Sequence, residues 1–143
     1  MTARILVIDT NVVVAGLLTS NPGSPTRWFL DGMLRGSFPF LLSGELLAEY
    51  RQVLLRPRIA SLHGLEEGEI DRVLAELVAN AVYRDLEPYE GPGGAPDPGD
   101  NHLWALLACE AGALLVTGDK LLLDNPPGTG EILSPSEAFD LLR

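Results

Sequence analysis

The sequence predicts an α/β protein in which helices cover both faces of a central, mostly parallel, twisted sheet, a three-layer α/β/α arrangement. Two observations support this class. Short apolar runs of strand length alternate with longer segments whose apolar residues recur at helical spacing, and this alternation favours parallel strands joined by helices. In addition, the chain has 143 residues, of which 46% are hydrophobic, and this is enough for one domain with its own core.

The first half of the chain contains two expected strands and three expected helices. In chain order these are a strand at 5–8, helices at 12–18 and 25–36, a strand at 38–43 and a helix at 44–57. Ser24 and Pro25 are typical of a helix start, because serine caps the first turn and proline fits its first position. Pro57 is expected to end the last of these helices, since a proline disfavours the helical conformation of the residue before it.

The second half repeats the alternation. The expected elements are a helix at 66–81, a strand at 82–86, a loop at 87–100, a helix at 101–112, a strand with its turn at 113–119, a strand at 131–133 and a helix at 134–143. Gly112 is typical of a helix C-terminus. Ser134 and Pro135 again mark a helix start.

Three acidic residues stand at the ends of expected elements. Asp9 follows the apolar run ILVI, Asp119 follows LLVTG, and Asp100 lies where the loop at 87–100 enters a helix. Parallel strands bring their carboxyl ends to one edge of a sheet, where ligands bind in such folds. Each acid could instead cap a helix or a turn.

A fourth acid lies on the helix expected at 44–57. Glu49 borders the apolar face of that helix, whereas Glu45, one turn earlier, points toward the polar side. Glu49 could also pair with Arg51 or Arg56 at the surface.

Four carboxylates gathered at one place would repel one another. Two charges 4 Å apart at an effective dielectric constant of ~20 repel by about 4 kcal/mol, so such a cluster requires a cation. Ligands that are all oxygen, without histidine or thiolate, favour Mg²⁺ or Mn²⁺. The net charge of −10 agrees with a protein that binds cations or a basic partner.

The motifs VIDTNV, SGELLAEYRQVLLRP, PDPGDNHLWALL and LVTGDKLLL occur in this order from the first strand to the last helix. Together they resemble the PIN domain, and more narrowly the PIN toxins of bacterial toxin–antitoxin pairs. The resemblance implies that residues 1–143 form a single PIN domain of three-layer α/β/α fold.

The resemblance also implies a metal-dependent ribonuclease with four acids around one or two Mg²⁺ or Mn²⁺ ions. By the matching motifs, the catalytic and metal-ligating acids are Asp9, Glu49, Asp100 and Asp119. Asn11, Thr117 and Asp97 are possible accessory residues. Asp97 is also the alternative third acid, although Asp100 is favoured because it directly precedes the helix.

The function expected from these residues is hydrolysis of RNA phosphodiesters by the toxin of a type II toxin–antitoxin pair. One alternative is a catalytically silent PIN-like module that binds a partner. Another is a different Mg²⁺-dependent acid-cluster hydrolase, such as a phosphatase-like enzyme. Such enzymes often carry a second aspartate two residues after the first, and here that position is Asn11. RNA would have to meet a local basic rim, for which Arg51, Arg56, Arg58 and Lys120 are candidates.

The expected partners are RNA, a cognate antitoxin protein and further copies of the chain in a homodimer or higher oligomer. The apolar stripe Trp28, Phe29, Leu30, Met33 and Leu34 is either a contact surface for such a partner or plain core. No membrane span or signal peptide is recognisable, and a single cysteine excludes an internal disulfide. A cytoplasmic protein is therefore expected.

Overall fold

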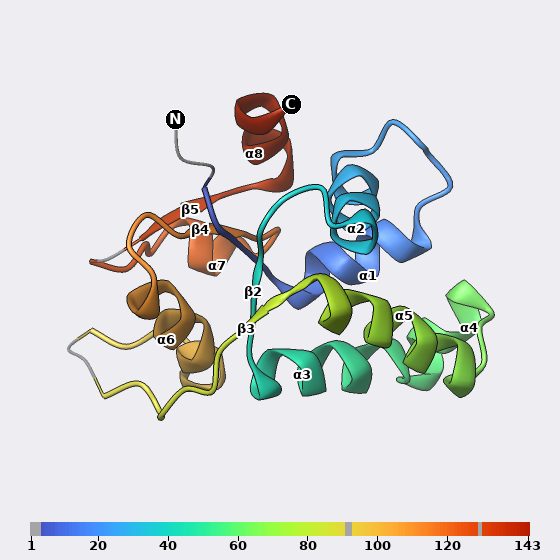
Figure 1. The fold of residues 1–143 in the computed structure, drawn as a ribbon, viewed down its shortest axis with the longest axis horizontal. Coiled ribbons are helices and arrows are strands. Elements are labelled where there is room, and N and C mark those ends of the chain that lie inside the picture. The colour runs from blue at the N-terminus through green and yellow to red at the C-terminus, as the bar shows by residue number, and fades with distance from the viewer. Residues whose placement is uncertain (1–3, 91–92, 129) are drawn as a thin grey trace.

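The computed structural model describes residues 4–90, 93–128 and 130–143. Its strands are β1 (Leu6–Ile8), β2 (Leu41–Leu42), β3 (Val82–Tyr83), β4 (Leu114–Val116) and β5 (Glu131–Leu133). The described strands pair only in parallel, in the orders β1-β4-β5 and β2-β3. A parallel bridge between Leu6 and Phe40 links the two groups, which gives the continuous arrangement seen in Figure 1. The predicted α/β fold with a mostly parallel sheet is confirmed.

The order of the strands reverses between β1 and β4. From β1 the chain proceeds to β2 and β3 on one side, and it later returns to add β4 and β5 on the other side. In open α/β sheets, ligands bind at the carboxyl ends of the strands at such a reversal. The backbone N–H of Asp9 donates to the carbonyl of Val116 at 3.0 Å, so the two strand ends are held side by side.

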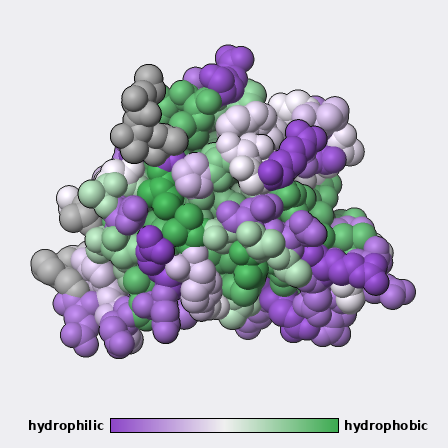
Figure 2. Space-filling model, in the orientation of Figure 1, coloured by the Kyte–Doolittle hydropathy of each residue, from purple (hydrophilic) through white to green (hydrophobic). Residues whose placement is uncertain are grey.

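The helices surround this sheet. They are α1 (Thr10–Leu18), α2 (Pro25–Arg35), α3 (Gly44–Leu54), α4 (Pro57–His63), α5 (Glu67–Asn80), the short 3₁₀ helix η1 (Pro98–Asp100), α6 (Asn101–Cys109), α7 (Lys120–Leu123) and α8 (Pro135–Leu142). Helix α6 packs on β1, β4 and α3, whereas α8 packs on β5 and α2. None of the helices in the described ranges is both long and apolar enough to span a membrane. Figure 2 shows hydrophilic residues gathered over α4 and α5.

The expectation that Pro57 ends a helix is wrong in an informative way. Helix α3 already ends at Leu54, and Pro57 is the first residue of α4, a helix that the sequence did not predict. Proline fits that position because its missing N–H would have no partner in the first turn. His63 links the chain segments on the two sides of α4 to each other. Its Nδ1 accepts from the N–H of Leu65 at 2.9 Å. Its Nε2 must then carry the proton, and it donates to the carbonyl of Leu54 at 2.8 Å.

Other boundaries differ by a few residues. The strand expected at 82–86 is regular only over Val82–Tyr83, and the turn expected to end at Asp119 leads into α7, a short helix that the sequence did not predict. The helix expected at 101–112 ends at Cys109. Residues 91–92 of the expected loop lie outside the described residues.

The core holds most of the apolar stripe of α2. Phe29, Leu30 and Met33 are buried, and the Trp28 ring contacts three other rings, including Phe139 of α8 with centroids 5.5 Å apart. The stripe is therefore used largely within the chain. Tyr50 is fully buried, and its hydroxyl donates to the carbonyl of Ile8. This hydrogen bond ties α3 to the end of β1, directly beside Asp9.

Candidate metal centre

Asp9 lies at the carboxyl end of β1 and is only 4% exposed. Its Oδ1 accepts from the N–H of Thr10 at 2.8 Å, so Asp9 does cap α1. Its Oδ2 accepts from Thr117 Oγ1 at 2.7 Å and from Asn11 Nδ2 at 3.0 Å. Burial raises the pKa of Asp9, and these hydrogen bonds oppose that rise. A carboxylate has about four acceptor positions, so one remains for a ligand.

Asn11 and Thr117 connect the two strand ends. Thr117 Oγ1 also accepts from the N–H of Asp119 at 3.0 Å, and Asn11 Oδ1 accepts from the N–H of Gly118 at 2.8 Å. Asp119 itself caps α7, because its Oδ1 accepts from the N–H of Leu121 at 3.0 Å. Asn11 and Thr117 thus hold the backbone at 118–119 and the Asp9 carboxylate in place.

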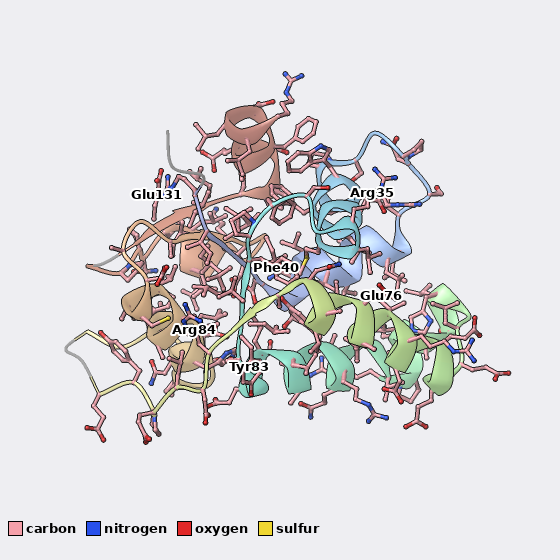
Figure 3. All side chains as sticks on the ribbon, in the orientation of Figure 1. Arg35, Phe40, Glu76, Tyr83, Arg84 and Glu131 are labelled. Atoms are coloured by element: carbon pink, nitrogen blue, oxygen red, sulfur yellow. The ribbon has the colours of Figure 1, made fainter. Side chains whose placement is uncertain are left out.

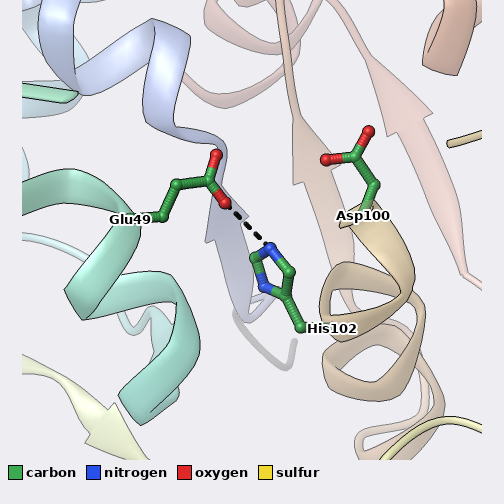
Figure 4. Close-up of side chains that lie close together, drawn as sticks. All are labelled: Glu49, Asp100 and His102. Atoms are coloured by element: carbon green, nitrogen blue, oxygen red, sulfur yellow. Dashed lines mark hydrogen bonds and ion pairs between the residues drawn. The ribbon is translucent and has the colours of Figure 1, made fainter. Parts of the chain in front are cut away.

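Glu49 projects from α3 toward α6, as Figure 4 shows. Its Oε2 lies 2.9 Å from His102 Nε2, and the side chains are 32% and 8% exposed, respectively. The hydrogen bond from His102 lowers the pKa of Glu49 and outweighs the opposing effect of burial. Burial by itself would lower the pKa of His102, but the hydrogen bond and charge of Glu49 dominate and raise it.

Asp100 stands directly before α6, yet its side chain makes no capping hydrogen bond. Burial, followed by the charges of Asp9, Asp97 and Glu49, raises its pKa to about 6. Asp97 is exposed, and its Oδ1 accepts from the N–H of Gly99 at 2.9 Å. The geometry therefore favours Asp100 over Asp97 as the acid that faces the others.

The four acids surround one hollow of ≈ 440 Å³ at the strand-order reversal. Its lining includes Asp9, Glu49, Asp100, Asp119 and Arg56. Arg56 is the only lysine or arginine among the described residues that line it. Repulsion between the carboxylates is thus largely uncompensated by the protein itself.

The residues present fit a divalent cation. Glu49, Asp100 and His102 each offer a ligand atom, and these atoms lie within 4.8 Å of one another. An oxygen-rich set of this kind suits Mg²⁺ or Mn²⁺.

Comparison with known families agrees with this arrangement. A family model described as PIN domain matches residues 5–121, a range that contains all four acids. The chain belongs to the PIN domain family. A comparison with curated proteins found no match. The resemblance inferred from the motifs is confirmed at the level of the family, whose members are generally nucleases.

The structure of this PIN domain also answers two questions about its side chains. His102 joins the site although the sequence offered no ligand pattern for it; the only signal was its position two residues after Asp100. Arg51 does not join the candidate basic rim, because its guanidinium binds Glu67 and Asp71 of α5. Of the four rim candidates, only Arg56 lines the hollow.

Proposed function

We propose that this protein is an endoribonuclease that hydrolyses RNA phosphodiesters with Mg²⁺ or Mn²⁺. The observation that carries the proposal is the gathering of four carboxylates around one hollow with a single arginine. The raised pKa of Asp100 reports the same excess of negative charge. Family membership supports nuclease chemistry, and the two alternative functions are outcomes of the experiment below.

The proposal assigns a part to each residue. Glu49, Asp100, Asp119 and the one unused acceptor position of Asp9 would hold the ion. When bound there, a divalent ion supplies Lewis-acid stabilisation of charge on the phosphodiester and makes water a stronger acid. His102 orients the Glu49 carboxylate through their hydrogen bond, and such outer hydrogen bonds hold ligands in place.

Arg56 has a different part. Its guanidinium is exposed at the edge of the hollow, where it can bind a phosphate oxygen of the RNA strand. This contact would bring the polyanion to a protein whose net charge is −10.

The proposal extends to the biological role. The order of the four motifs favours the toxin of a type II toxin–antitoxin pair, acting in the cytoplasm and inhibited by a cognate antitoxin protein. A homodimer or higher oligomer is part of the same proposal. Co-purification with the product of a neighbouring small reading frame, together with loss of RNA cleavage in that complex, tests the antitoxin.

The nuclease is tested with an end-labelled RNA of mixed sequence and a titration of Mg²⁺ or Mn²⁺. Cleavage should require the ion, and Glu49→Gln should lower the rate on the order of a hundredfold. Glu76→Gln is the matched control, because Glu76 is an exposed glutamate on α5 and should leave the rate unchanged. Wild-type protein that binds Mn²⁺ but cleaves no RNA would contradict the proposal and favour a silent module. Hydrolysis of phosphomonoesters instead of RNA would favour the phosphatase-like alternative.

A further inference from the structure

A second and larger pocket lies beside the carboxylate hollow. It measures ≈ 630 Å³ and opens between the start of α3, the chain after β3 and the start of α6. We call it the β3-exit pocket; the lining residues used here are Glu45, Tyr83, Asp85, Glu87, Tyr89 and His102. Its volume lies within the range of ligand pockets, ~300–1,000 Å³.

The β3-exit pocket is negatively charged. Glu45, Asp85 and Glu87 line it, and no lysine or arginine does so among the described residues. Glu45 lies in the first turn of α3, where the helix dipole stabilises its charge. Asp85 and Glu87 are exposed and make no ion pair with any described residue. A ligand that enters here must therefore carry positive charge or several N–H donors.

The pocket also has aromatic walls. Tyr83 is 49% exposed and lies at the end of β3 near the first turn of α3, as Figure 3 shows. Gly44, the first residue of α3, has no Cβ, and one added there would lie 3.0 Å from the Tyr83 hydroxyl. The phenol ring of Tyr83 therefore extends over the start of α3. Tyr89 supplies a second ring. Flat aromatic faces attract cations, and guanidinium groups most often.

A buried polar atom adds a separate indication of a ligand. The His102 side chain is 8% exposed, and its Nε2 is engaged with Glu49. Its Nδ1 is buried without a hydrogen-bond partner in the described structure, although buried polar atoms usually have one. Since His102 lines the pocket, an entering polar group can satisfy this atom.

We propose that the β3-exit pocket binds the guanidinium group of an arginine side chain carried by a basic peptide or protein partner. A guanidinium stacks on tyrosine and offers five N–H donors to carboxylates in a planar fork. A phosphate would be repelled by the three carboxylates, and a nucleobase gains nothing from their net charge. The site is distinct from the carboxylate hollow and does not depend on nuclease activity.

The binding test uses acetyl-arginine-amide as the probe and its neutral isostere acetyl-citrulline-amide as the control. Amide chemical shifts are followed by NMR with Mg²⁺ in excess, so that the ion competes for the carboxylate hollow. The arginine probe should shift signals of residues 83–89 saturably, and citrulline should bind roughly tenfold more weakly because it lacks charge. Equal binding of both probes would overturn the proposal.

Variants locate the site. Asp85→Asn combined with Glu87→Gln should weaken the arginine probe roughly tenfold, whereas the surface control Glu76→Gln should not. Tyr83→Ala should weaken binding and Tyr83→Phe should retain it, since the ring and not the hydroxyl stacks. The proposal is overturned if Asp119→Asn abolishes binding while the double variant binds normally, or if cytidine or guanosine binds these residues more tightly than the arginine probe.

Discussion

Two groups of acids flank α3, and the protein treats them in opposite ways. On α5, Asp71 and Glu67 both contact the guanidinium of Arg51, with 2.8 Å between Arg51 Nε and Asp71 Oδ1. The hydrogen bond from Arg51 lowers the pKa of Asp71. Around the hollow, burial and neighbouring carboxylates raise the pKa of Asp100 to about 6.

The difference shows that a cluster of acidic residues indicates a ligand site only where lysine and arginine side chains of the protein do not already balance its charge. The α5 group is complete within the chain, because a bidentate arginine supplies the opposite charge. The hollow is lined by four carboxylates and, among the residues that the structure describes, one exposed arginine, so these side chains leave an excess of negative charge.

The largest effect is stabilisation by Mn²⁺. An ion that binds only the native state at about a hundred times its dissociation constant stabilises the protein by about 2.7 kcal/mol. Thermal unfolding of wild type should shift upward accordingly, and Asp100→Asn should lose most of the shift. Asp71→Asn should retain it, because Asp71 already has Arg51. An unchanged unfolding curve in saturating Mn²⁺ would mean that the hollow is not a metal site.

The next effect concerns His102. Replacing it with glutamine removes the ring that orients Glu49, and loss of such an outer partner weakens metal binding by about 10–100-fold. Calorimetric titration with Mn²⁺ measures this change. His63→Gln is the matched control, since the ring of His63 bonds to the backbone of Leu54 and Leu65 and its replacement should alter stability but not metal affinity. Equal affinities of wild type and His102→Gln would refute the positioning role.

A smaller effect appears in the pH dependence of the metal-free protein. Since the folded pKa of Asp100 is raised from 3.8 to about 6, the native state holds its proton more tightly than the unfolded chain. The contribution of Asp100 to stability therefore falls as pH rises from 3.8 to about 6 and stays unfavourable above that. Asp100→Asn should be more stable than wild type at pH 7.5, and the gap should close near pH 4. Urea unfolding at both pH values measures it, and a gap independent of pH would contradict the raised pKa.

The smallest effect is expected at Arg51. Its ion pairs with Glu67 and Asp71 are solvent-exposed, and exposed pairs contribute little and are screened by salt. Arg51→Gln should lower the melting temperature less than any variant in the hollow alters it, and roughly 1 M salt should remove the difference. RNA cleavage should not change. A clear loss of cleavage would mean that Arg51 contributes to RNA binding, as the sequence had suggested.

Local patterns in the sequence were enough for the fold class and for part of the site. Apolar runs and helical spacing predicted the parallel sheet, because periodicity depends only on neighbours in the chain. The same patterns put Asp9 and Asp119 at strand ends and turned Glu49, rather than Glu45, toward the interior, where Glu49 is partly buried and Glu45 is exposed.

Only the tertiary structure decided which charges meet. His102 and Glu49 are 53 residues apart, and they touch because α6 packs on α3. Arg51 lies only two residues from Glu49, yet it turns to α5 and binds Asp71. Pro57 begins α4 and does not end α3, which already ends at Leu54. Sequence patterns report the face on which a residue lies, whereas its partner depends on which elements pack against that face.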